Sequence, residues 1–173
     1  MKIQLFFVIL FALNQGFLWL TLTNKSLRSF KTLGAILFVL IPFLPVFFGQ
    51  PRFELDYFWW RVSGPIAILM GSVFIYLGYM EFKKNSASIL DIPKKLVDSK
   101  VYAHIRHPQY LGLIFIFVGW WWIWAAVYSF YFGMFILALI WIQGYLEETI
   151  ILSKAFGKKF IDYKNRTGMY WIK

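Results

Sequence analysis

Five apolar segments, each close to twenty residues long, take up most of the 173-residue chain. Each approaches the ~20 helical residues that cross a hydrocarbon core of ~30 Å. Inside lipid every backbone amide needs a partner within its own segment, which a helix provides. Only 15% of the residues are charged, against roughly a quarter in a soluble domain. The sequence therefore predicts an all-α integral membrane protein with spans at residues 3–22, 32–48, 62–80, 108–126 and 130–146.

The connections between these spans are short except for one basic loop at residues 81–107. No polar stretch is long enough to form a separate soluble domain, so we expect a single membrane domain over residues 1–173. The fourth and fifth spans should form a hairpin, because almost no loop separates them. The tail at residues 147–173 mixes apolar and charged residues and is expected to lie at the interface as a helix.

Several residues inside the spans indicate how the helices pack. Prolines should kink the second span, and small residues in the third should permit close helix approach. Polar residues in the first span should hydrogen-bond between helices, and tryptophans in the fourth should form an aromatic belt at the outer interface. The residues concerned are, in that order, Pro42 and Pro45; Gly64, Gly71 and Gly78; Asn14 and Gln15; and Trp120, Trp121, Trp122 and Trp124.

The basic residues are distributed unevenly along the chain and give it a formal charge of +10. Fifteen of the 18 Lys and Arg residues fall in the loop after the first span, in the loop 81–107 or in the tail. The other three are Lys2, Arg52 and Arg61. Basic residues beside spans mark the cytoplasmic side. We therefore expect the N-terminus outside, the loop and tail in the cytoplasm, and no nucleic-acid partner.

The chain has no cysteine and only two histidines, His104 and His107. Disulfides, thiolate nucleophiles and cysteine-based metal clusters are therefore excluded, as are the multi-histidine di-iron sites of membrane hydroxylases. The two histidines could bind a metal together with a glutamate, but no third histidine or cysteine is present. We accordingly predict no metal site.

The hairpin places ionisable groups from distant positions at one end. Its two arms are similar in length, so their cytoplasmic ends should align. Arg106, His107 and Tyr110 should then meet Glu147 and Glu148 at the edge of the membrane. Taken singly, each has a structural explanation, such as a positive anchor or the start of an interfacial helix. Together they indicate a functional site, because ionisable groups at a membrane edge are expensive to keep there.

A series of motifs resembles the isoprenylcysteine carboxyl methyltransferase family, within the wider group that includes phospholipid methyltransferases. The motifs are KLVDSKVY at residues 95–102, RHPQYLG at 106–112, Glu147-Glu148, and FGKKFIDY at 156–163. RHP-x-Y alone is a weak signal, but its combination with an acid pair and the FG-x-x-F-x-x-Y motif is fairly specific. The resemblance covers roughly residues 94–168.

The resemblance implies an integral membrane methyltransferase that uses S-adenosylmethionine without a Rossmann domain, and no G-x-G-x-x-G motif is present. Its methyl acceptor would be a lipid or another membrane-soluble compound, reached from within the bilayer. We expect Arg106 and Glu147 to act on the acceptor side or in acid–base catalysis. By the same resemblance, the cofactor contacts would be Leu96, Val97, Tyr102, His107, Pro108, Tyr110 and Glu148.

The chain departs from the family pattern at three points, one of which is the tail at residues 168–173, where the customary proline is missing. Gln143-Gly144 stands where a basic residue associated with the acceptor is common, and Lys100 stands at a usual glycine. The nature of the acceptor therefore stays open among carboxylate, amine, thiol and hydroxyl. Two other functions are also compatible with the residues: an NADPH-dependent membrane reductase, since sterol reductases carry a similar RHP-x-Y motif, and a non-enzymatic membrane protein.

Overall fold

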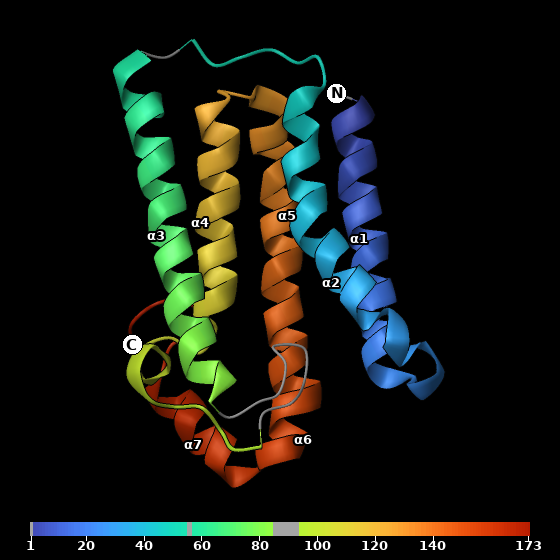
Figure 1. Ribbon diagram of the computed structural model, residues 1–173, viewed down its shortest axis with the longest axis vertical. Coiled ribbons are helices and arrows are strands. Elements are labelled where there is room, and N and C mark those ends of the chain that lie inside the picture. Colours follow the sequence, from blue (N-terminus) through green and yellow to red (C-terminus); the bar gives the residue numbers. More distant parts are fainter. Residues whose placement is uncertain (1, 55–56, 85–93) are drawn as a thin grey trace. The chain divides into compact units, whose positions relative to one another are not determined.

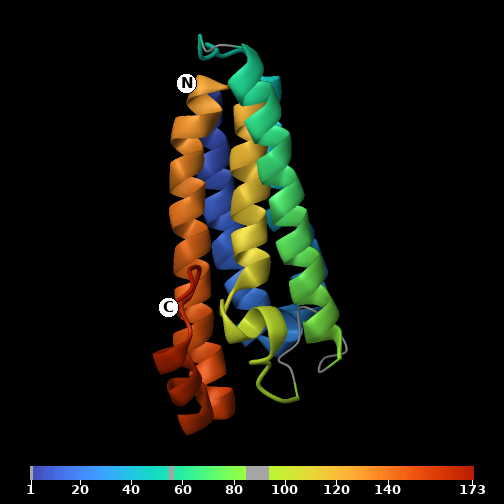
Figure 2. The ribbon, with the colours of Figure 1, turned by 90° about the vertical axis from the view of Figure 1, so that its left-hand side faces the viewer.

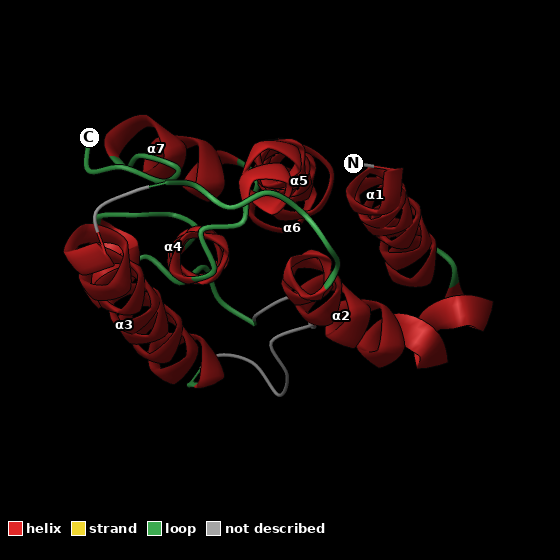
Figure 3. Cartoon of the chain, turned by 90° about the horizontal axis from the view of Figure 1, so that it is seen from above, coloured by secondary structure: helices red, strands yellow, loops and turns green. Residues whose placement is uncertain are grey.

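The computed structural model describes residues 2–54, 57–84 and 94–173, and these residues form helices joined by short loops (Figure 1). No strand occurs among them (Figure 3). The α-helices are α1 (Lys2–Thr23), α2 (Lys31–Leu40), α3 (Tyr57–Lys83), α4 (Pro108–Ile123), α5 (Val127–Leu146), α6 (Ser153–Phe156) and α7 (Lys158–Arg166). Four further segments have other helical geometry: the 3-10 helices η1 (Lys25–Phe30), η2 (Ile41–Phe47) and η3 (Lys100–Ala103), and the π-helix η4 (Glu147–Leu152).

Four of the helical segments are long and apolar enough to cross a membrane: Lys2–Thr21, Ser26–Phe47, Trp59–Lys83 and Val127–Phe156. The apolar helix Pro108–Ile123 is shorter. The prediction of an all-α integral membrane protein is therefore confirmed. The fourth span ends at Ile123, three residues before the expected boundary, because the chain turns through Ala125, whose φ is +48°.

The chain divides into two compact units. Unit 1 comprises Met1–Leu69 and Phe115–Ile140, and unit 2 comprises Met70–Ile114 and Trp141–Lys173. Each unit thus combines two stretches that are distant in sequence, and α3, α4 and α5 each contribute residues to both. The expectation of a single membrane domain stays a prediction.

In unit 1, α1 presents a buried face of Phe7, Phe11 and Leu18. Two polar residues on α1 make the interhelical hydrogen bonds that the sequence predicts. The Asn14 amide donates to the Gly34 carbonyl at 3.0 Å, and the Gln15 amide donates to the Leu139 carbonyl at 3.2 Å. Such bonds stabilise helix contacts where no water competes for them.

The tryptophans of α4 have a different role from the one expected. Pro42 and Pro45 lack the N–H groups that an α-helix needs, so α2 gives way to the 3-10 helix η2. Two carbonyls released there accept indole hydrogen bonds, from Trp121 to Pro42 at 2.8 Å and from Trp120 to Phe43 at 3.1 Å. Trp121 is only 1% exposed. The prediction of an interfacial belt is therefore wrong for Trp121, which anchors the broken helix instead.

Glycines bring α3 and α4 together within each unit. A Cβ atom at Gly119 would lie 2.7 Å from the Gly64 carbonyl oxygen in unit 1. A Cβ atom at Gly112 would lie 2.6 Å from the Gly71 carbonyl oxygen in unit 2. Neither distance leaves room for a methyl group, so the predicted close approach at the third span is confirmed.

Candidate active site

Within unit 2, the chain that leads into α4 is held by the C-terminal segment. Pro108 is the first residue of α4, a position that suits its missing N–H group. The backbone N–H groups of the two residues before it donate to the C-terminal segment that follows α7 (Figure 2). Arg106 donates to the Gly168 carbonyl at 2.9 Å and His107 to the Met169 carbonyl at 3.1 Å. These two hydrogen bonds fix the backbone positions of Arg106 and His107, from which their side chains extend.

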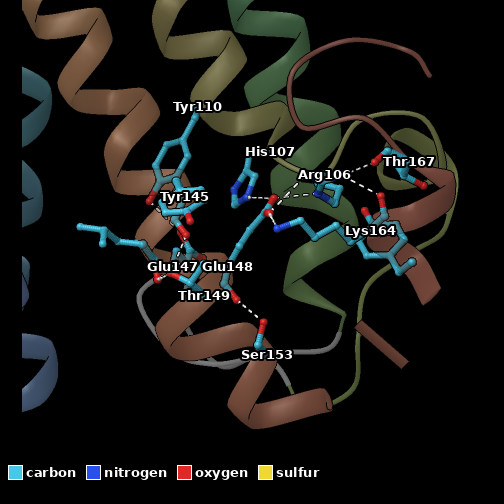
Figure 4. Close-up of polar contacts among 12 residues, drawn as sticks. Arg106, His107, Tyr110, Tyr145, Glu147, Glu148, Thr149, Ser153, Lys164 and Thr167 are labelled. Carbon is cyan, nitrogen blue, oxygen red and sulfur yellow. Dashed lines mark hydrogen bonds and ion pairs between the residues drawn. The ribbon is translucent and has the colours of Figure 1, made fainter. Parts of the chain in front are cut away.

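Glu148 forms the centre of a buried charged cluster (Figure 4). Arg106 donates to both carboxylate oxygens, from Nε at 2.7 Å and from a terminal nitrogen at 3.2 Å. His107 Nε2 lies 3.1 Å from the same carboxylate, and Lys164 Nζ lies 3.2 Å from it. Arg106 also donates to the carbonyls of Lys164 and Thr167. With two permanent cations around one carboxylate, the cluster carries an excess of positive charge.

Glu147 has a different environment. Its carboxylate accepts a hydrogen bond from the Tyr110 hydroxyl at 2.9 Å, and the side chain is partly buried. Among the residues that the structure describes, it makes no ion pair. The Tyr110 ring stacks on the His107 ring, with centroids 5.4 Å apart, and so joins the two glutamates into one site.

The two adjacent acids reach different partners because the helix changes its geometry at this point. α5 ends at Leu146, and the chain continues directly as the π-helix η4 over Glu147–Leu152. The Ser153 N–H and hydroxyl both bond to the Glu148 carbonyl, five residues earlier. Such wide turns are rare and often occur at functional sites. The α-helix thus ends at Leu146, as expected, but the helical chain continues beyond it.

Buried tyrosines hold the loop before α4 to the rest of unit 2. Tyr102 is 7% exposed, and its hydroxyl lies 3.4 Å from the Gly78 carbonyl. The Tyr163 hydroxyl on α7 donates to the Tyr102 carbonyl at 2.6 Å. Burial raises the pKa of Tyr102, Tyr163 and Tyr170, so all three keep their protons at neutral pH. The loop is also held to α3, because Ser99 donates to the Glu81 carboxylate at 2.8 Å.

The structure thus brings together most of the residues proposed from the sequence. Arg106 and His107 bond to Glu148, and Tyr110 bonds to Glu147, so the five residues meet as the hairpin argument predicted. The stacked rings of His107 and Tyr110 join the two groups into one network. The other proposed cofactor residues lie outside this network but in the same unit: Leu96 is partly buried, while Val97, Tyr102 and Pro108 are buried. His104 is exposed on the loop.

Sequence reasoning missed two members of the site. Lys164 appeared only as one of many basic tail residues, since nothing in its spacing marks it as a partner of Glu148. Gln143 was noted only as a departure from a family pattern. It lies one helical turn before Glu147 on α5, where it is buried and hydrogen-bonds to the Tyr110 hydroxyl.

The fold and the cluster define a helical membrane protein with a polar site in unit 2, where α4 begins and α5 ends. A family model described as phospholipid methyltransferase matches residues 59–159, more than half of the chain. The chain therefore belongs to the phospholipid methyltransferase family and is a membrane methyltransferase. The match includes Arg106, His107, Tyr110 and both glutamates and ends before Lys164. No curated protein and no solved structure matches the chain.

Proposed function

We propose that the protein transfers a methyl group from S-adenosylmethionine to a lipid or another membrane-soluble acceptor at the cytoplasmic interface. The main support is the network around Glu147 and Glu148, which lies within the residues matched by the family model. Buried ionisable groups at a membrane edge are costly to maintain and mark functional sites.

The residues present fit the chemistry of this cofactor. Its amino-acid portion carries a carboxylate, which suits the excess positive charge of Arg106 and Lys164 around Glu148. The ammonium and ribose hydroxyls suit Glu147, which has no cationic partner among the described residues. The tyrosine rings nearby suit the sulfonium, because aromatic faces attract cations.

The side chains would contribute chiefly by positioning and by accepting a proton. When bound, S-adenosylmethionine supplies a methyl group on a positively charged sulfur that an acceptor nucleophile can attack in line. Glu148 holds Arg106 and Lys164, which would in turn orient the cofactor's carboxylate. Where the acceptor itself brings the amine, Glu147, whose carboxylate Tyr110 orients, would take the proton that methylation releases.

Calorimetric titration of the purified protein in detergent tests the cofactor assignment. S-adenosylhomocysteine should bind, and His107→Ala and Glu148→Gln should weaken its binding while circular dichroism shows an unchanged helical content. A folded wild-type protein that binds neither S-adenosylhomocysteine nor S-adenosylmethionine would overturn the proposal. Stabilisation against heat by NADPH instead would favour the reductase alternative, since a ligand that binds the folded state raises the melting temperature.

The acceptor can be sought by mass spectrometry. Lipid extracts from cells with and without the protein should differ by species heavier by one methylene unit. A Glu147→Gln strain provides the matched control, because this substitution should leave the protein folded in the membrane and remove the proposed activity.

A further inference from the structure

Gln143 carries a buried hydrogen-bonding atom without a partner in the part of the chain that the structure describes. Its side chain is 3% exposed, and its Oε1 atom has no hydrogen-bond donor among the residues that the structure describes. Buried carbonyl groups are nearly always paired, so an orphaned one beside a binding site needs an explanation. Gln143 lies in unit 2, on the last turn of α5, one turn before Glu147 of η4.

The orientation of the Gln143 amide follows from the hydrogen bonds of Tyr110. The Tyr110 hydroxyl has one proton, which it donates to the Glu147 carboxylate at 2.9 Å. The same hydroxyl is hydrogen-bonded to Gln143. Because its proton is already used, Gln143 must present its N–H group there. The Oε1 atom therefore faces away from Tyr110 and is left unsatisfied, in agreement with its missing partner.

Gln143 Oε1 and the Glu147 carboxylate can only accept hydrogen bonds. Both side chains converge on the Tyr110 hydroxyl, and no Lys, Arg or His of the described residues forms an ion pair with Glu147. A carboxylate or phosphate would be repelled from such a place. A positively charged group with several N–H donors would satisfy both oxygens. The Glu148 cluster, with its excess of cations, would instead attract an anionic group.

We propose that Gln143 and Glu147 form a subsite for an ammonium or amine group, in which Gln143 Oε1 accepts one of its hydrogen bonds. This inference rests on the proposed function and assigns Gln143 a binding role. The N–H donors have two possible sources: the α-amino group of the cofactor or an amine on the methyl acceptor. Both present the same chemistry to Gln143, and the experiment below separates them.

The test compares ligands that differ only in their N–H donors. S-adenosylhomocysteine and its desamino analogue are titrated calorimetrically into the full-length wild-type protein and Gln143→Met in detergent. If the cofactor supplies the amine, Gln143→Met should weaken S-adenosylhomocysteine binding by about 10- to 100-fold and leave the desamino analogue unaffected. If the acceptor supplies it, cofactor binding should not change. Gln143→Met should then abolish the extra thermal stabilisation by short-chain phospholipids with an ethanolamine rather than a choline head group.

Two further variants serve as controls. Gln4→Met makes the same change at a buried glutamine of unit 1 whose side-chain atoms also lack partners among the described residues, and it should leave all binding unchanged. Gln143→Glu retains oxygen acceptors and should restore the preference for the amine. Equal weakening of both cofactor analogues in Gln143→Met, or no change for any of the ligands, would overturn the subsite. Absence of binding by the wild-type protein would instead reject the proposed function.

Discussion

Two adjacent glutamates in this site have opposite electrostatic environments. Glu148 is surrounded by Arg106, His107 and Lys164. Glu147 accepts a phenolic hydrogen bond from Tyr110 and has no cationic partner among the described residues. A buried carboxylate with that many partners is itself a structural requirement, because its removal leaves other charges uncompensated. The partner of an acid, and not its position in a motif, therefore decides whether it is free to bind a ligand.

Substitution of each glutamate by glutamine should separate these roles. Glu148→Gln leaves Arg106 and Lys164 without a counter-charge and should lower the free energy of unfolding by on the order of 3 kcal/mol or more. Glu147→Gln retains an acceptor for Tyr110, so its cost should stay within about 1 kcal/mol. Denaturant unfolding in mixed micelles, followed by circular dichroism, measures both. Equal losses for the two variants would contradict the assignment.

Lys100 shows why glycine is usual at its position. Its φ is +54°, in the left-handed region that costs an L-residue roughly 1 kcal/mol. Its Nζ lies 3.8 Å from the Glu81 carboxylate, but the side chain is 73% exposed, so this pair contributes little. Lys100→Gly should therefore leave stability unchanged or raise it by up to about 1 kcal/mol. Lys100→Val should lower the stability. Melting temperatures of the two variants measure both effects, and a lower value for Lys100→Gly than for the wild type would contradict the role of the positive φ.

At the scale of whole elements, the apolar runs were sufficient to predict the helices but not their irregular parts. The lengths of the runs predict α1 to α5, and the matched hairpin arms predict that Arg106 and His107 meet Glu148. The π-helix η4 has no local signature, because Glu147–Leu152 is equally compatible with an ordinary α-helix. The contacts of Lys164 and Trp121 could not be predicted either, because their partners lie far away in sequence and only the tertiary fold brings them together.

The C-terminal segment should be necessary for the site although it lies beyond the family match. Its carbonyl groups accept hydrogen bonds from the backbone of Arg106 and His107 and from the Arg106 side chain. Truncation before Thr167 should abolish S-adenosylhomocysteine binding and speed proteolysis of the loop before α4. Truncation after Tyr170 removes only exposed residues and should be tolerated. Normal cofactor binding by the shorter protein would contradict this role.

The contact between α7 and the loop should make the protein sensitive to alkali. Burial raises the pKa of Tyr163 above its ordinary value of about 10. Above that pH the unfolded state loses the proton while the folded state still holds it, so stability falls as pH rises beyond about 10. Tyr163→Phe should be less stable at neutral pH, having lost the bond to Tyr102, but should show a shallower alkaline decline. The exposed Tyr131→Phe is the control and should behave as the wild type.

At the scale of the whole molecule, every residue of the candidate site belongs to unit 2. The two stretches of this unit are separated in sequence by residues 115–140, which belong to unit 1. Most of the basic residues also lie in unit 2, which contains 12 of the 18 Lys and Arg residues. A polar site among basic segments suits a charged, water-soluble cofactor that meets an acceptor from the bilayer. The side of the membrane that these segments face therefore determines where the cofactor must be supplied.

The absence of cysteine allows the orientation to be measured without background labelling. The excess of Lys and Arg predicts that the site faces the cytoplasm. Single cysteines at the exposed positions Lys94, Lys158 and Arg52 would be treated with a membrane-impermeant maleimide on intact and permeabilised cells. Arg52→Cys should react in intact cells, whereas Lys94→Cys and Lys158→Cys should react only after permeabilisation. The reverse pattern would place the site outside, where no intracellular S-adenosylmethionine could reach it, and would exclude the proposed reaction at that face.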